Sequence, residues 1–127
     1  MIVIDASTAL AGLLNNGKAR ELLATGRVCA PDIVDTGVVD GLRRLTRSQQ
    51  VSVDAAYAAL GTWQVLGIRR FPSRPLAQRV WELNEALDTA PATSAALAER
   101  LDIAWVTADP LAGASREVTC PVTVVPN

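Results

Sequence analysis

The sequence predicts an α/β fold in which helices cover both faces of a central parallel sheet, a three-layer α/β/α sandwich. Short apolar runs typical of buried strands alternate along the chain with longer segments of helical periodicity. Signals for tight hairpins are few, so successive strands are joined by helices, and such crossovers make the strands parallel. A length of 127 residues suits one domain of ordinary size, and we expect a single domain over residues 1–127.

The chain opens with a strand and two short helices. Met1 to Asp5 is an apolar run that ends in an acid, which is typical of a buried parallel strand. Residues 7–14 have helix-forming composition, the turn Asn15-Asn16-Gly17 ends that helix, and a second helix spans residues 18–24. A second strand is expected at residues 28–30.

Two longer helices follow this second strand. Pro31-Asp32 opens the first, which runs to about Arg47, and Asp32 is its expected N-cap. Ser52 is the expected N-cap of the other helix. An apolar stripe with helical spacing includes Tyr57, and Trp63 extends this stripe into the core.

The second half of the chain continues the alternation and ends in two strands. A strand comes first, then a helix that Pro72-Ser73-Arg74-Pro75 starts, then an alanine-rich helix. Trp81 is expected to pack beside the apolar side of the first of these helices. The elements are expected at residues 67–71, 72–87, 91–101, 103–107 and 122–125, with a loop around Gly113 before the last strand.

Composition narrows the possible chemistry. The absence of histidine removes Ser-His-Asp and Cys-His catalysis and zinc sites with His ligands, so carboxylate chemistry remains. With 50% hydrophobic and 20% charged residues, the composition is that of a globular protein. No apolar run is long enough to span a membrane, and no leader pattern is present, so we expect a cytoplasmic protein without a membrane partner.

Neither the cysteines nor the arginines form a recognisable ligand motif. Cys29 and Cys120 lie in apolar, strand-like surroundings without metal-ligand spacing, and we expect reduced structural thiols. A net charge of −1 argues against a uniformly basic nucleic-acid binder. Several arginines cluster in the sequence and form either a local basic patch or the solvated faces of helices. These are Arg43, Arg44, Arg47, Arg69, Arg70, Arg74 and Arg79.

Two aspartates at strand ends are the most informative residues. Asp5 follows the first strand, and Asp109 follows the apolar run at residues 103–107. Open α/β sheets bind their ligands at the carboxyl ends of the strands, so both carboxylates can enter one crevice and hold a metal ion there. An Asp directly after a strand is also a common helix N-cap, and this alternative stays open for each acid taken alone.

Four segments, taken in order, resemble the PIN domain of bacterial VapC toxins over essentially the full length of the chain. They are the opening MIVIDAS, the segment APDIVDTGVVDGLRRL, the unit SAALAERLDIAWVTAD and the closing CPVTVVP. The resemblance implies an α/β/α sandwich, a homodimer, a VapB antitoxin as partner, and Mg²⁺- or Mn²⁺-dependent endoribonuclease activity held by a cluster of acids.

Two of the four acids in this family pattern are present. Asp5 matches the first acid, and Asp109 matches the acid of the strand-end T-x-D motif. The second acid belongs to the phrase D-x-E-x-x-x-x-L-R-R-L, in which Gly37 takes the place of the glutamate. The third begins a later helix as Y-D-A-x-Y, and Pro91 takes the place of its aspartate. Because Mg²⁺ depends on nearby carboxylates to offset its charge, these losses weaken metal binding and cleavage.

Nearby acids are candidates to complete the site. Asp40 lies one helical turn beyond Gly37 and is the candidate third metal ligand beside the two strand-end acids. Asp88 precedes Pro91 by one loop step and is a second candidate. Asp35 is two residues from Gly37 and therefore points to a different side of the helix.

Two hydroxyl side chains lie beside the retained acids in the family pattern. Ser7 either bonds a metal-bound water or caps the first helix. Thr107 either bonds such a water or only favours the strand. The local structural reading is the one we favour for both residues.

Two function classes remain open. In the first, which we favour, the chain is a VapC-like protein whose degenerate site no longer cuts RNA efficiently and which acts by binding protein or RNA. In the second, it is an active Mg²⁺- or Mn²⁺-dependent endoribonuclease toxin of a VapBC system that uses Asp5, Asp109 and a substitute acid. A relic without selected activity is a third, plainer possibility.

Overall fold

A five-stranded sheet runs through the centre of the molecule, and every strand pair in it is parallel. The computed structural model describes residues 1–127. Its strands are β1 (Ile2–Ile4), β2 (Val28–Pro31), β3 (Arg69–Phe71), β4 (Ala104–Thr107) and β5 (Val122–Val124). They lie in the order β3-β2-β1-β4-β5, with parallel pairing throughout. The chain therefore builds outward from β1 to β3 and then crosses back, so that β1 and β4 are neighbours at the switch point.

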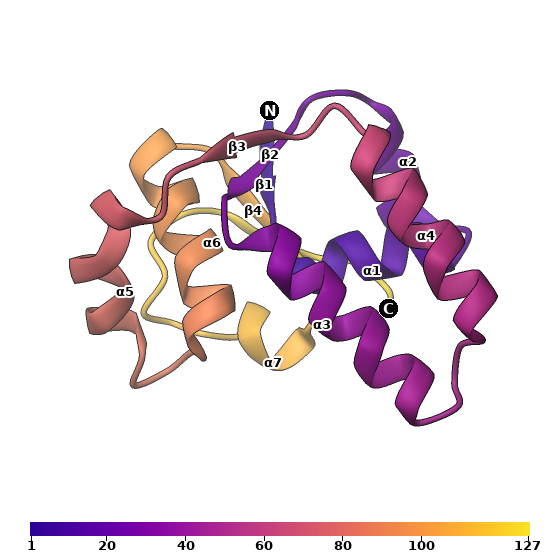
Figure 1. Cartoon of the computed structure of the whole chain (residues 1–127). Coiled ribbons are helices and arrows are strands. Elements are labelled where there is room, and N and C mark those ends of the chain that lie inside the picture. The colour runs from indigo at the N-terminus through magenta and orange to yellow at the C-terminus, as the bar shows by residue number, and fades with distance from the viewer.

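Helices cover both faces of this sheet. Four helices, from α1 to α4, gather on one face and α5 and α6 lie on the other, as Figure 1 shows. The helical elements are α1 (Ala6–Leu14), α2 (Lys18–Ala24), α3 (Val34–Arg47), α4 (Val53–Val65), the 3-10 turn η1 (Arg74–Leu76), α5 (Ala77–Leu83), α6 (Thr89–Leu101) and α7 (Pro110–Gly113). The predicted three-layer α/β/α sandwich with a parallel sheet is thereby confirmed.

Successive strand residues point into two separate cores. Val3 and Trp105 belong to the cluster under α5 and α6, whereas Ile4 and Val106 belong to the cluster under the four other helices. All four side chains are at most 2% exposed. This alternation is the period of two that a strand imposes, and it explains why the central strand β1 is apolar at every position.

Small residues let α3 lie close against α1. A Cβ atom added at Gly37 would lie 2.9 Å from the Cβ of Ala6, and one added at Gly41 would collide with the side chain of Leu10. The two glycines are one helical turn apart and therefore share the face that meets α1. Gly37 thus has a packing role in addition to standing where the family pattern has an acid.

Several local predictions need correction. Ile33, not Asp32, is the N-cap residue of α3, and the Asp32 carboxylate instead accepts a hydrogen bond from Ser73 N at 3.2 Å. Tyr57 and Trp81 are 80% and 79% exposed, so neither is part of the core. The expected loop around Gly113 begins as the short helix α7.

Two predictions about α4 hold. Ser52 caps α4, since its hydroxyl accepts a hydrogen bond from Ala55 N at 3.1 Å, and Trp63 is buried in the core. Both cysteines are free, with Cys29 buried. No helix has the length and apolar character needed to cross a membrane.

An ion pair joins α3 to the edge strand β3. Arg70 donates two hydrogen bonds, of 2.7 and 2.8 Å, to the two oxygens of Asp35, and Trp63 Nε1 donates a third at 2.8 Å. The Arg70 guanidinium also lies 5.6 Å from the centre of the Trp63 ring. The hydrogen bond from Arg70, assisted by the one from Trp63, lowers the pKa of Asp35 despite some burial. Asp35 therefore has a structural partner away from Asp5.

This pair predicts a contribution to stability that disappears in acid. A carboxyl with a lowered pKa stabilises the fold above its ordinary pKa, and the effect is lost as the pH falls through the lowered value. Since both side chains are about one-third exposed or more, we expect Arg70→Gln to cost less than about 1 kcal/mol at pH 7. Urea unfolding at pH 7 and pH 3 measures this difference.

The matched control is Arg69→Gln, because Arg69 lies over the Phe71 ring and has no carboxylate partner. Its effect should not change with pH. An equal loss of stability for Arg70→Gln at both pH values would contradict the role given to the Asp35–Arg70 pair.

Candidate functional site

The two strand-end aspartates come from neighbouring strands. Asp5 follows β1 and Asp109 lies two residues beyond β4, and these strands pair directly, with Ile4 opposite Val106. Both acids therefore lie at the carboxyl edge of the sheet, beside the switch point where open α/β sheets bind ligands. Each is also a helix N-cap, Asp5 for α1 and Asp109 for α7. The capping alternative left open by the sequence thus applies to both residues.

Asp5 is held tightly on one side. Its Oδ1 accepts hydrogen bonds from Ser7 Oγ at 2.6 Å, Thr8 N at 3.1 Å and Thr8 Oγ1 at 3.3 Å. The residue is 5% exposed. Its other oxygen, Oδ2, accepts no hydrogen bond and yet is not sealed from solvent, so it is the part of Asp5 that can meet a ligand.

Asp109 is more open. Its Oδ1 accepts hydrogen bonds from Leu111 N at 3.0 Å and Ala112 N at 3.4 Å, which is the usual pattern of an N-cap. The residue is exposed, unlike Asp5. The two carboxylates therefore differ in how much of their charge solvent already screens.

Two hydroxyls link the acids into one hydrogen-bonded chain. Ser7 Oγ accepts a bond from Ala108 N at 3.0 Å and lies 3.3 Å from Thr107 Oγ1. Thr107 Oγ1 in turn accepts a bond from Asp109 N at 3.2 Å. Ser7 is thus not the cap of α1, and Thr107 does more than favour a strand. Together they fix the start of α1 against the end of β4.

Two further residues at this edge were not predicted. Thr8 is fully buried and donates to Val106 O at 2.9 Å as well as to Asp5. Ser94 of α6, 2% exposed, donates to Ile4 O at 3.3 Å. Both tie strand ends to helices across long sequence separations. The small hydroxyl residues next to each acid were the available signal, but only the fold shows their partners.

Gly37 and Pro91 stand at the two positions where the family pattern predicts an acid. Gly37 lies inside α3 against Ala6, and Pro91 lies in the first turn of α6. A proline is tolerated there because the first N–H groups of a helix have no partner within the helix. Pro91 is therefore compatible with the first turn of α6.

The two candidate substitute acids are both on the surface. Asp40 is paired with Arg44 at 3.2 Å, and both side chains are about 70% exposed, 71% for Asp40 and 69% for Arg44. Asp88 is the N-cap residue of α6, but its side chain makes no capping hydrogen bond. No group of three or more His, Cys, Asp or Glu side chains lies close enough together to hold a metal ion.

This donor set does not fit a Mg²⁺ or Mn²⁺ ion as arranged. Such ions take about six oxygen ligands in octahedral geometry and rely on carboxylates to offset their charge. Of the candidate acids, Asp5 and Asp109 follow neighbouring strands, and one oxygen of each already accepts two or three hydrogen bonds from the protein. Asp40 would first have to leave Arg44.

A cleft of about 800 Å³ opens beside Asp109. Its wall combines apolar side chains of α1 with polar groups, and Arg44 and Asp109 are the charged side chains among its lining residues. The lining is Ala6, Ser7, Leu10, Leu14, Asn15, Gly41, Arg44, Leu45, Gln50, Val51, Ser52, Ala55, Ala108, Asp109, Pro110 and Asn127. A cleft of this size and mixed character can take a peptide segment or a nucleotide unit.

Some of the clustered arginines form ion pairs, and the others do not. Arg44, Arg70 and Arg79 pair with Asp40, Asp35 and Glu99 respectively. The remaining four arginines of the two clusters make no ion pair, namely Arg43, Arg47, Arg69 and Arg74. The positive charge is therefore spread over two regions of the chain and is partly neutralised.

Known proteins resemble this chain in sequence and in structure. No family model matches it. Ribonuclease VapC9 of Mycobacterium tuberculosis is 44% identical over 126 residues, which cover 99% of this chain and 99% of that protein. The crystal structure of VapC20 from Mycobacterium tuberculosis, a Sarcin-Ricin loop cleaving toxin, covers 87% of this chain and 91% of that chain, with 22% identity and a TM-score of 0.61. That of PAE2754 from Pyrobaculum aerophilum covers 95% and 81%, with 17% identity and a TM-score of 0.71.

The unequal environments of the two acids predict unequal effects on stability. Asp5→Ala leaves the half-buried Ser7 hydroxyl and the buried Thr8 N–H without the Asp5 acceptor and should cost about 2–3 kcal/mol. Asp109→Ala removes an exposed cap and should cost about 1 kcal/mol. Urea unfolding at neutral pH measures both values.

Asp54→Ala is the control, since Asp54 is an exposed acid in the first turn of α4. It should change stability by less than about 0.5 kcal/mol. If Asp109→Ala lowered the free energy of unfolding as much as Asp5→Ala does, the additional hydrogen bonds of Asp5 would not account for its effect on stability.

Proposed function

The chain belongs to the VapC family of PIN-domain proteins, and on that premise we propose that it acts by binding, with metal-dependent RNA cleavage weak or lost. The family implies an RNA ligand, a VapB-like antitoxin and a second copy of the chain as partners in the cytoplasm. The proposal assigns this protein the binding part of that role. The cleavage part would require an acidic site that its residues do not readily supply.

One observation carries the proposal: Asp5 and Asp109 have no third carboxylate beside them. Metal-assisted cleavage of a phosphodiester needs the ion fixed as a Lewis acid and as the source of a nucleophile. Two carboxylates, each engaged through one oxygen, would hold the ion weakly. Asp40 and Asp88 lie on the surface, and neither belongs to the lining of the cleft beside Asp109.

The helix-capping roles of Asp5 and Asp109 give further support to the proposal. Asp5 and Asp109 cap helices that begin directly at the carboxyl edge of the sheet. Folding alone therefore explains the presence of an acid at each position. Neither residue needs a metal ion to account for it.

The alternative function is an active Mg²⁺- or Mn²⁺-dependent endoribonuclease toxin of a VapBC system. In its favour, the chain is 44% identical to proteins named ribonucleases. The Oδ2 atom of Asp5 also accepts no hydrogen bond and is not fully sealed, and the exposed Asp40–Arg44 pair would cost little to break. In this reading Asp40 or Asp88 completes the site once a metal ion is present.

Metal binding separates the two readings. Calorimetric titration with Mn²⁺ should give weak or undetectable heat for the unaltered chain, because two carboxylates offset too little of the charge. Pro91→Asp and the double variant Gly37→Glu, Pro91→Asp should bind more tightly. Pro91→Asp tests the restored acid alone, since a side chain at position 37 must first displace Ala6. Tight binding by the unaltered chain that Asp40→Asn removes would favour the alternative.

Cleavage and toxicity give a second, independent test. The purified chain should leave a structured RNA intact in Mg²⁺ or Mn²⁺, and its expression without an antitoxin should not arrest growth. If RNA is a ligand, a fluorescently labelled copy of the same RNA should show a rise in anisotropy when the protein is added. Cleavage that Asp5→Asn abolishes would overturn the proposal, and Asp54→Asn serves as the control for a charge lost elsewhere.

A further inference from the structure

The segment between α7 and β5 has little regular structure and few polar ties to the rest of the protein. Residues 116–120 contain no helix or strand. Glu117 O accepts a hydrogen bond from Arg79 Nη2 at 2.9 Å, and Thr119 N donates one to Glu99 Oε2 at 2.8 Å. Glu117 N also donates a weak bond of 3.4 Å to the nearby Ser115 Oγ, and Cys120 Sγ makes one long contact of 4.0 Å with Ala95 O. Directly after the segment, Pro121 O accepts a bond from Trp105 N of β4 at 2.9 Å. Arg79 and Glu99 thus carry both strong attachments of the segment.

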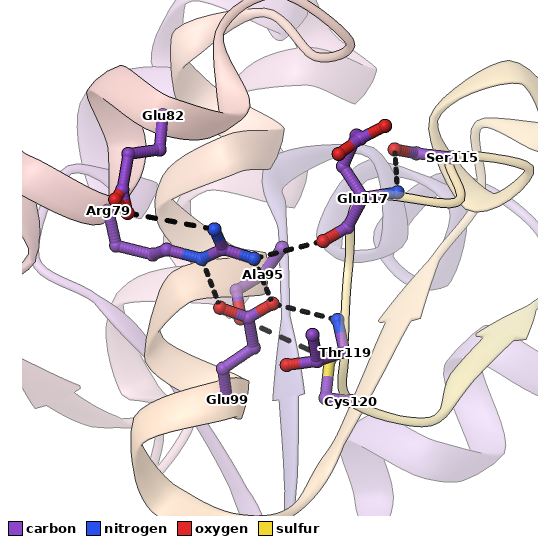
Figure 2. Close-up of polar contacts among 8 residues, drawn as sticks. All are labelled: Arg79, Glu82, Ala95, Glu99, Ser115, Glu117, Thr119 and Cys120. Carbon is purple, nitrogen blue, oxygen red and sulfur yellow. Dashed lines mark hydrogen bonds and ion pairs between the residues drawn. The ribbon is translucent and has the colours of Figure 1, made fainter.

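These two side chains also bind each other. Arg79 donates to Glu99 Oε1 at 2.7 Å and to Oε2 at 3.0 Å, a bidentate pair that joins α5 to α6 (Figure 2). The Glu99 side chain is 11% exposed, and Glu82 adds a third carboxylate contact to Arg79 at 3.7 Å. Burial alone would raise the pKa of Glu99, but the bonds from Arg79 and Thr119 outweigh it and lower the pKa. The Glu99 carboxylate is therefore kept charged, and both of its oxygens accept hydrogen bonds.

The segment is linked in turn to the helix that carries Asp109. The α7 helix has four residues, and the backbone of Gly113 lies so close to Val124 of β5 that an added Cβ atom would collide with it. Strand β5 is a three-residue edge strand that pairs only with β4. Since α7 and β5 rest on each other, the placement of the 116–120 segment affects both.

We propose that Arg79 and Glu99 are positioning residues for Asp109, because they fasten the 116–120 segment and through it keep α7 and β5 against the end of β4. Val118 and Cys120 add apolar packing on the α5–α6 core, so the pair acts together with that contact. The inference rests on the proposed function only in that Asp109 belongs to the binding site. It gives the ion pair between α5 and α6 a role in arranging Asp109.

Amide hydrogen exchange in the whole protein tests this link directly. The amides of Leu111 and Ala112 donate to the Asp109 carboxylate, so their protection reports whether that carboxylate is in place. In Glu99→Gln, exchange at these two amides and at Thr119 should rise about tenfold or more. The Thr8 amide, which donates to Asp5, should change by less than about twofold.

Two further variants keep the test sharp. Arg79→Lys keeps the charge but loses the bidentate geometry, and it should give an intermediate rise at the same amides. Arg70→Gln removes an ion pair elsewhere in the fold and should leave Leu111 and Ala112 unchanged. Faster exchange at all amides, Thr8 included, would mark a general loss of stability and overturn a positioning role.

The hydrogen-exchange result and the test of RNA cleavage can each fail without the other. A rise confined to Thr119, with Leu111 and Ala112 unchanged in Glu99→Gln, would overturn the inference and leave the proposed function standing. RNA cleavage that depends on Asp5 would overturn the proposed function and leave the exchange result valid. A rise in exchange at the amides of Leu111, Ala112 and Thr119 supports the inference.

Discussion

The direct pairing of β1 with β4 is the constraint on which the rest of the structure depends. It places residues from the two ends of the sequence side by side, with Ile4 opposite Val106. Thr8 bonds to Val106 O, and Ser7 bonds to Ala108 N, so α1 begins in contact with the end of β4. Without this pairing Asp5 and Asp109 would have no shared site. The long return connection that places β4 beside β1 thus brings the two acids to the same edge of the sheet.

Much of this arrangement could be predicted from the sequence. Apolar runs and helix-forming segments predict the alternation of strands and helices, because buried parallel strands and crossover helices have distinct patterns. Local details were harder, since they depend on distant partners. Asp32 meets Ser73 rather than capping α3, and Trp81 lies on the outer side of its helix. A short helix such as α7 has too few residues for any periodicity to appear.

The candidate site could be predicted in outline only. The two acids were found because each follows an apolar run, and a strand-end acid has a simple sequence signal. Their surroundings could not be predicted, because Ser94, Thr8 and the Arg79–Glu99 pair act across long sequence separations. Each acid caps a helix through its Oδ1 atom, and of the two only Asp109 lines the cleft.

The two edge strands of the sheet, β3 and β5, have features that oppose pairing with a second chain. Exposed edge strands offer unpaired backbone groups to other chains and are a common route to aggregation. Here both edge strands have three residues, and β3 begins with Arg69 and Arg70. The short length of both edge strands and the positive charge of β3 make edge-to-edge pairing with another chain unfavourable. The Arg70 side chain is meanwhile tied to Asp35 on the helical layer, so the same residue that anchors β3 also discourages fibre growth from that edge.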